Sequence, residues 1–306
     1  MSTEKIIEVK SLTKQFSRIR AVDNLDLNVY QGDVFGFLGP NGAGKSTTIR
    51  MLLTLIKPTS GMISLFGKPL NQHRSEILRR VGAIVEKPDF YLNLTAKKNL
   101  ELLGKISGAD VSSANIMKIL ELVGLEKRYD SRVKTFSHGM KQRLGIAQAL
   151  LHQPDLIILD EPTTGLDPQG IKEIRDLIIH LSRDLGKTIF LSSHILSEIE
   201  IIATRMIIIN KGTTVVEGTV DELLNSGILK VTFEVEEPAA AAELLRQSEW
   251  KDKLADVSNN VISMTLSKSE TAAVNRYLVE KGITVGAVIP IRSLEQYFLE
   301  ITQGEK

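Results

Sequence analysis

A nine-residue glycine-rich loop constrains this sequence more than any other feature. Residues 39–47 read GPNGAGKST and match the pattern G-x-x-x-x-G-K-[ST]. The apolar run 34–38 before the loop predicts a buried strand, and residues 45–55 after it predict a helix. In this setting glycines let backbone N–H groups surround a phosphate, and the start of the helix adds a favourable dipole. The loop therefore predicts an α/β fold that holds the phosphates of a nucleotide.

Two side chains of the loop have chemical roles in this interpretation. Lys45 can reach the β- and γ-phosphates as a catalytic cation, and Ser46 can ligate Mg²⁺, as P-loop NTPases do. ATP and Mg²⁺ are therefore the expected cofactors. The loop residues expected to contact the nucleotide are Gly39, Asn41, Gly42, Ala43, Gly44, Lys45, Ser46 and Thr47.

A second apolar run, at residues 156–159, ends in the adjacent carboxylates Asp160 and Glu161. Asp160 is expected to face the metal through water, as the second acid of P-loop NTPases. Glu161 is placed to polarise the attacking water as a general base, an effect worth about 10²- to 10⁴-fold in rate. Two acids after a strand usually belong to a turn, but the run PTTGLD at residues 162–167 follows directly and argues against that interpretation.

The remaining pattern predicts two domains. Strand-like runs at residues 188–191 and 205–210 alternate with helical segments, which indicates a largely parallel sheet. Apolar residues at helical spacing predict a helical subdomain over about residues 90–152. Because the nucleotide motifs are confined to the first two thirds of the chain, we expect an ATP-binding domain at residues 1–219 and a C-terminal domain at residues 220–306.

The C-terminal domain shows the order strand, helix, strand, strand, helix, strand. This is the order of the split-βαβ, ferredoxin-like arrangement, so a small α+β domain is expected, followed by a short helix over residues 293–301. Two roles stay open for it, a brace for dimerisation or a regulatory module, because this fold performs many functions. The expected strands are 229–235, 254–257, 261–266 and 284–291, and the expected helices are 238–247 and 270–281.

The composition excludes several classes of protein. The chain has 306 residues, a formal net charge of +1 and no cysteine. It can therefore form no disulfide and no thiolate metal site, and nothing favours a nucleic-acid partner, which a basic excess would indicate. The N-terminus lacks the apolar core of a signal peptide, and no apolar run is long enough to span a bilayer.

With these motifs in order, residues 4–218 resemble the nucleotide-binding subunit of ABC transporters. The run TFSHGMKQR is similar to the family signature LSGGQ-x-x-R, with His138 and Met140 as departures from it. Ser137 and Gly139 keep the key groups and are expected to open a helix, which makes another anion-binding N-terminus. In the family this helix binds the γ-phosphate held by the opposite subunit, so that two subunits sandwich each ATP.

The resemblance implies roles for three further side chains. Asp167 matches the D-loop, which in the family couples the two sites of the dimer. His194 matches the switch histidine, which would contact the γ-phosphate and orient the water; a lone histidine is more often structural, but this one follows ordered motifs. Phe16 lies where family members place an aromatic ring that stacks on adenine, and an ordinary core phenylalanine is the alternative.

Glu86 is the sharpest departure from the family pattern. Most members have glutamine here, with its side-chain oxygen facing Mg²⁺ and the attacking water, and a carboxylate can also ligate Mg²⁺. With the run FYLNLT at residues 90–95, Glu86 makes the chain resemble the ATPases of bacitracin and lantibiotic export and self-protection systems. A peptide antibiotic, a lipid-targeting antibiotic or a similar amphipathic compound is thus the expected cargo. The alternative is a tolerated substitution in another exporter.

The loop from Glu86 to Leu94 also bears on partners. It carries Phe90, Tyr91 and Leu92 in a row, an apolar patch of the kind that marks an interface. In the family a short helix of the membrane subunit docks beside this loop; the alternative is that the patch merely covers the helical subdomain.

The expected partners are membrane-spanning permease subunits on another chain and either a second copy of this chain or a sister ATPase. The expected location is the cytoplasmic face of the bacterial cell membrane. A soluble ABC ATPase acting on DNA or ribosomes is the rival class, but such proteins typically have a long coiled-coil insertion or a second ATP module, and this chain has neither.

Overall fold

The computed structural model describes residues 4–224, 229–258 and 260–292. The chain divides into two compact units, Met1–Gly218 and Thr219–Lys306, and each has a hydrophobic core of its own. The helix expected over residues 293–301 lies outside the described residues.

An antiparallel sheet of four strands forms one end of the first unit. Its strand order is β2–β1–β4–β5, and Val9 of the first strand pairs with Leu27 on one side and with Ile63 on the other. Alternate residues such as Leu25, Leu27 and Val29 are buried, so one face of this sheet covers the core. The strands are β1 (Lys5–Phe16), β2 (Ile19–Tyr30), β4 (Ser60–Leu65) and β5 (Lys68–Pro69).

A sheet of six strands forms the centre of the first unit, in the order β10–β9–β3–β8–β7–β6. Strands β9, β3, β8, β7 and β6 pair in parallel. All five residues of β3 and all four of β7 are buried, as expected of strands covered on both faces. The bounds are β3 (Val34–Leu38), β6 (Val81–Ile84), β7 (Leu156–Leu159), β8 (Thr188–Ser193), β9 (Arg205–Asn210) and β10 (Thr213–Thr219).

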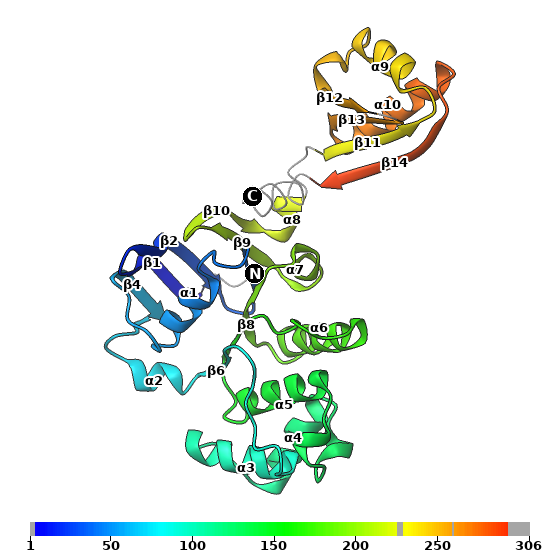
Figure 1. The fold of residues 1–306 in the computed structure, drawn as a ribbon. Helices are drawn as coiled ribbons and strands as arrows, with labels where there is room; N and C mark the ends of the chain where they lie inside the picture. The colour runs from blue at the N-terminus through cyan, green and yellow to red at the C-terminus, as the bar shows by residue number, and fades with distance from the viewer. Residues whose placement is uncertain (1–3, 225–228, 259, 293–306) are drawn as a thin grey trace. The chain divides into compact units, whose positions relative to one another are not determined.

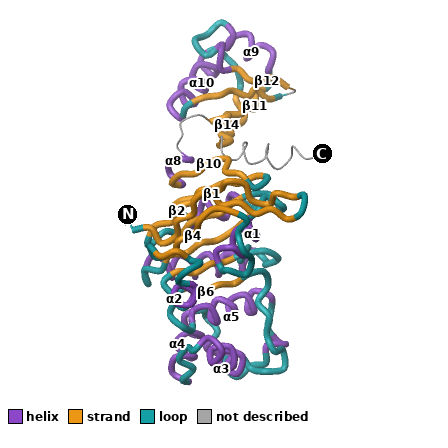
Figure 2. Tube along the Cα trace, turned by 90° about the vertical axis from the view of Figure 1, so that its left-hand side faces the viewer, coloured by secondary structure: helices purple, strands orange, loops and turns teal. Residues whose placement is uncertain are grey.

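The helices of the first unit fall into two groups. Helices α3, α4 and α5 gather at the end of this unit opposite β1, β2 and β4 (Figures 1 and 2), while α1, α6 and α7 connect the strands of the six-stranded sheet. The bounds are α1 (Lys45–Leu52), α2 (Arg74–Leu78), α3 (Ala96–Ser107), α4 (Ser113–Leu122), α5 (His138–Leu150), α6 (Pro168–Arg183) and α7 (Leu196–Ile202), with short 3-10 turns at Glu126–Arg128 and Val133–Thr135.

Helix α1 is shorter than the sequence predicts. The expected helix over residues 45–55 ends at Leu52, because Thr54 has a φ of +58° and the Leu55 amide bonds back to the Arg50 carbonyl at 2.8 Å. A left-handed residue followed by such a backward bond is a common way for a helix to end.

The second unit has one antiparallel sheet in the order β12–β13–β11–β14. This order, with two helices between the strands, is that of the split-βαβ arrangement. Both helices bury residues in the same core, where Trp250 stacks edge-on against Tyr277 at 5.4 Å between ring centres. The bounds are α8 (Val220–Leu224), β11 (Leu229–Val235), α9 (Pro238–Arg246), β12 (Leu254–Ser258), β13 (Val261–Leu266), α10 (Lys268–Glu280) and β14 (Val285–Arg292), with a 3-10 turn at Lys251–Lys253.

Candidate functional site

The glycine loop leaves the carboxyl end of β3 and runs into α1. Gly44 has a φ of +109°, and a Cβ atom on it would lie 2.5 Å from the Ala21 carbonyl oxygen, so only glycine fits between the loop and strand β2. Ala43 and Gly44 are buried, whereas Ser46 and Thr47 at the helix start stay partly exposed. The loop therefore presents hydroxyl groups and the N-terminus of an eight-residue helix at the edge of the sheet.

Lys45 is the buried cation of the site. Only 5% of its side chain is exposed, and its Nζ donates to the carbonyls of Gly39 at 2.8 Å and Pro40 at 3.2 Å. The same Nζ lies 3.3 Å from Oε1 of Glu161. The loop thus folds around its own lysine, and the ammonium group faces the carboxylate that follows β7.

The Glu161 carboxylate lies within hydrogen-bond or ion-pair distance of three side chains, those of Lys45, Thr164 and His194. Thr164 Oγ1 donates to Glu161 Oε2 at 2.9 Å, and His194 Nδ1 donates to the same oxygen at 3.1 Å. Burial raises the pKa of Glu161, but the hydrogen bond from Thr164 and the charges of Lys45 and His194 outweigh it and leave the pKa below the ordinary value. The carboxylate is consequently ionised at neutral pH and able to accept a proton.

Asp160 is buried directly before Glu161, at 4% exposure. Its Oδ1 accepts a hydrogen bond of 2.6 Å from Ser192 Oγ, and the same hydroxyl accepts from the Glu161 backbone N–H at 2.9 Å. Ser192 therefore fixes both acids at once. Ser192 belongs to no motif in the sequence, but the parallel register explains its role: Leu159 pairs with Leu191, so Asp160 and Ser192, the residues that follow this pair, are neighbours.

The structure brings Lys45, Asp160, Glu161 and His194 together at the carboxyl ends of β3, β7 and β8, which are neighbours in the sheet. Ligands of open parallel sheets bind at this edge. The backbone of Glu161 has a φ of +48°, which is uncommon outside glycine and concentrates at functional sites.

Glu86 follows β6 at the same edge, one strand beyond β7. Its backbone is also left-handed, with a φ of +63°, and its carboxylate forms an ion pair with Arg50 on α1. The Glu86 side chain is 65% exposed. Arg50, the partner of Glu86, is, after Ser192, the second residue that the sequence did not indicate. Its position could have indicated it, because it lies four residues after Ser46 and hence on the same face of α1.

Phe16 ends strand β1 and is 45% exposed, with the Lys14 ammonium 4.8 Å above its ring. It is therefore not a core residue, which removes the alternative considered for it. The β1–β2 hairpin that carries Phe16 also supplies the Ala21 carbonyl that packs on Gly44 of the loop.

The signature segment forms a capped helix start. Ser137 is the N-cap of α5, where its hydroxyl accepts from the Met140 N–H at 3.2 Å. Asp167 caps α6 in the same way and accepts from the Gly170 N–H at 2.8 Å. Within the described part of the chain, no hydrogen bond or ion pair joins Ser137 or Gly139 to the glycine loop.

The apolar loop of residues 86–94 is only partly a surface patch. Tyr91 is 57% and Leu92 49% exposed, but Phe90 is buried at 7%, so the expectation of three exposed residues in a row was wrong for Phe90. The cause is local: Asn99 on α3 accepts from the Tyr91 N–H and donates to its carbonyl, which holds the loop against the helical group.

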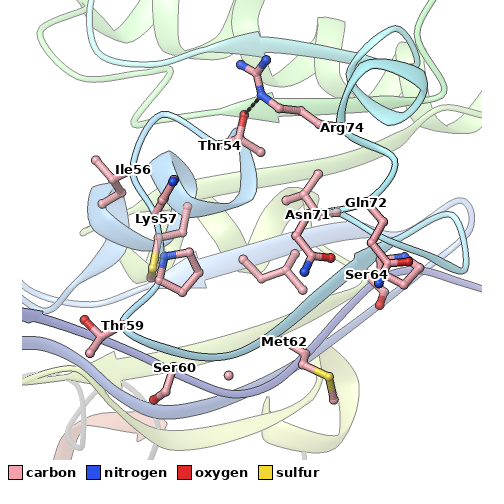
Figure 3. A pocket seen from close by; sticks show the side chains of 16 residues that line it. Thr54, Ile56, Lys57, Thr59, Ser60, Met62, Ser64, Asn71, Gln72 and Arg74 are labelled. Carbon is pink, nitrogen blue, oxygen red and sulfur yellow. Dashed lines mark hydrogen bonds between the residues drawn. The ribbon is translucent and has the colours of Figure 1, made fainter.

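A cavity of about 690 Å³ lies elsewhere in the first unit (Figure 3). The end of α1, the segment leading into β4 and the β5–α2 connection line it, and Asn71 points into it. None of the predicted site residues lines this cavity. Among the described residues there is also no cluster of three histidine, aspartate or glutamate side chains able to hold a metal alone.

The parallel sheet, the glycine loop at its carboxyl edge and the adjoining acids define a P-loop ATPase. A model of the ABC transporter family matches residues 22–164. The chain is 46% identical to the bacitracin transport ATP-binding protein BcrA of Bacillus licheniformis, over 99% of each chain. It is 38% identical to the daunorubicin/doxorubicin resistance ATP-binding protein DrrA of Streptomyces peucetius, over 80% of this chain and 76% of that one.

Solved structures agree with this assignment. The ATP-binding subunit of an ABC transporter is 32% identical and superposes with a TM-score of 0.63, over 72% of this chain and 92% of that one. A dimeric bacterial ABC transporter cassette, MJ0796, is 27% identical with a TM-score of 0.63, over 70% and 98%. The chain belongs to the ABC transporter family as an ATP-binding, ATP-hydrolysing subunit. Within the residues described, no helix is both long enough and apolar enough to cross a bilayer.

Proposed function

We propose that the chain energises the export of a peptide antibiotic, a lipid-targeting antibiotic or a similar amphipathic compound through a separate membrane subunit. Glu161 carries the ATP-hydrolysing part of this proposal, because its ionised carboxylate lies between Lys45 and His194 at the edge of the sheet where a nucleotide would bind. The relatives with bacitracin and daunorubicin/doxorubicin in their names support the choice of cargo.

Glu161 acts as the general base in this mechanism. Its carboxylate accepts a proton from the water that attacks the γ-phosphate, and its lowered pKa keeps it ionised and ready at neutral pH. Lys45 turns from the loop carbonyls and Glu161 to the phosphates, where its charge stabilises the transition state. His194, whose Nδ1–H already faces Glu161, orients the carboxylate and the water.

The residues at the sheet edge fit Mg²⁺. This ion takes only a few oxygen ligands from a protein and completes its shell with water and phosphate oxygens. The Ser46 hydroxyl, the Asp160 carboxylate and Glu86 are all oxygen donors, and Ser192 holds the Asp160 carboxylate in place. When bound, the ion would neutralise charge on the phosphates.

Two copies of the ATP-binding unit, or one copy and a sister ATPase, complete each site in the proposed cycle. Within the described part of one chain nothing joins Ser137 or Gly139 to its own glycine loop, and the relative MJ0796 forms a dimer. ATP that binds better to the closed dimer shifts the population toward it, and loss of the γ-phosphate reopens it. The membrane subunit would dock at Tyr91 and Leu92, on the cytoplasmic face of the membrane.

The variant Glu161→Gln tests the proposal. It keeps the shape but removes the proton acceptor, so we expect a loss of about 10²- to 10⁴-fold in ATPase turnover with ATP binding retained. Calorimetry would measure the retained ATP binding of this variant. Sedimentation velocity would show whether the variant forms a dimer when ATP is present. Wild-type turnover in this variant would contradict the assignment of the base.

The same variant tests the cargo in cells. Expressed with its membrane subunit in a bacitracin-sensitive host, the wild-type chain should raise the inhibitory concentration of bacitracin, and Glu161→Gln should not. A wild-type chain that hydrolyses ATP but confers no resistance would overturn bacitracin as cargo and leave the ATPase assignment intact.

A further inference from the structure

His138 occupies a position where the family signature has glycine, and it makes a contact that glycine cannot make. Its Nδ1 lies 3.0 Å from the Gly165 carbonyl oxygen. Because a carbonyl only accepts hydrogen bonds, Nδ1 must carry the proton. A Cβ atom at residue 165 would lie 3.2 Å from the ring, so His138 packs directly on the bare backbone of Gly165.

The contacted residue lies in the loop that carries the general base. The loop of residues 161–167 is anchored at its start, where Ser192 accepts from the Glu161 N–H, and at Thr163, which donates to Glu198 at 2.6 Å. Thr164 and Gly165 at its tip are exposed. Among the described residues, His138 supplies the hydrogen bond that reaches this tip from another element.

The tip in turn holds the carboxylate. Thr164 Oγ1 donates to Glu161 Oε2 at 2.9 Å, and its backbone N–H bonds to the Glu161 carbonyl at 3.2 Å. Gly165 has a φ of +76° and, as glycine, can reach many other conformations once its carbonyl is released. Because Gly165 is joined directly to Thr164, a change in the φ and ψ angles of Gly165 after its carbonyl is released would let Thr164 and its hydroxyl shift.

We propose that His138 is a positioning residue for ATP hydrolysis: its Nδ1–H bond to the Gly165 carbonyl fixes the loop tip and, through Thr164, the orientation of the Glu161 carboxylate. The proposal rests on the role of Glu161 proposed above. In this role His138, at the start of the signature helix α5, acts within its own chain and does not contact a nucleotide.

Two amide variants separate this bond from packing. Asparagine places its amide nitrogen near the position of Nδ1, whereas glutamine reaches the position of Nε2. We expect His138→Ala and His138→Gln to lower kcat about tenfold with an unchanged KM for ATP, since misplacing a catalytic group by a fraction of an ångström can have such effects. His138→Asn should stay within about twofold of the wild-type kcat.

In this proposal His138 acts on the Glu161 carboxylate through Thr164. A double-mutant cycle can therefore test whether the two side chains act together. Thr164→Val should lower kcat by a similar factor, and His138→Ala combined with Thr164→Val should lose no more than either change alone. Additive losses, a wild-type kcat for His138→Ala, or equal losses for His138→Asn and His138→Gln would each overturn the proposal.

Two further measurements test different roles for His138 and Glu161. If His138 contacted the partner's nucleotide instead, His138→Ala in the Glu161→Gln background would weaken ATP-dependent dimerisation in sedimentation velocity; we expect no change. If Glu161 were not the base, Glu161→Gln would retain turnover, and the proposed function would fail whatever the double-mutant cycle showed.

Discussion

At the residue scale, Glu86 shows how a carboxylate can stand where the family has a neutral amide. Arg50 neutralises it from α1, so the added negative charge does not face the phosphates alone. Because both partners are well exposed, the pair should contribute less than about 1 kcal/mol to the free energy of unfolding. We therefore expect Glu86→Gln to keep basal ATPase activity within about fivefold, the rate factor that corresponds to 1 kcal/mol, and to alter the stimulation of activity by the membrane subunit.

Basal ATPase rates and chemical denaturation followed by circular dichroism would check this expectation. Arg50→Gln is the matched control, because it removes the opposite charge of the same pair. If Glu86→Gln abolished basal activity while Arg50→Gln did not, Glu86 would act directly in the chemistry.

The residues with chemical roles were easier to predict from the sequence than the residues that hydrogen-bond to them and hold them in place. Lys45, Asp160, Glu161 and His194 follow strands, and the carboxyl ends of neighbouring parallel strands meet. Ser192 and Thr164 were missed because a hydroxyl group carries no motif; its role appears only when the register of β7 and β8 is known. Phe90 was misplaced because the bonds from Asn99 that draw its loop inward are invisible in an apolar pattern.

At the element scale, helix α10 illustrates how a cap makes stability depend on pH. Ser267 accepts from the Glu270 N–H, while Glu270 accepts from the Ser267 N–H and pairs with Lys253. The hydrogen bond from Lys253, followed by those from Ser267, lowers the pKa of Glu270 to about 2. A carboxyl group whose pKa is lowered by folding stabilises the fold above its unfolded pKa, and this contribution is lost as the pH falls from about 4.5 toward 2.

We therefore expect the wild-type second unit to lose more stability between pH 5 and pH 3 than Glu270→Gln. Urea denaturation followed by the fluorescence of Trp250 measures this, since Trp250 is the only tryptophan of the chain and lies in the core of that unit. Glu243→Gln on α9, which removes an exposed pair with Arg246 at 3.6 Å, is the control. Equal pH dependence in wild type and Glu270→Gln would contradict the argument.

Helices and strands in which apolar residues recur at a regular period or form an unbroken run were predictable from the sequence. The residues at which these elements end were not. Strands β3 and β7 lie within the predicted apolar runs, because burial on both faces leaves no room for polar residues. Helix α1 ended early because the left-handed conformation of Thr54, a β-branched residue, follows from tertiary packing and not from local preference.

At the scale of the whole molecule, the two cores predict two unfolding transitions. ATP with Mg²⁺ should bind only the first unit, where the glycine loop lies, and a ligand at 100 times its Kd stabilises by about 2.7 kcal/mol. For a unit of this size that corresponds to a rise in Tm of about 5–10 °C. We expect this rise in the circular dichroism transition of the first unit and an unchanged midpoint for Trp250 fluorescence. Lys45→Ala should abolish the rise in Tm, because it removes the cation that meets the phosphates. An ATP-dependent shift in the midpoint of the Trp250 fluorescence transition would contradict the expectation and show that the second unit senses the nucleotide site.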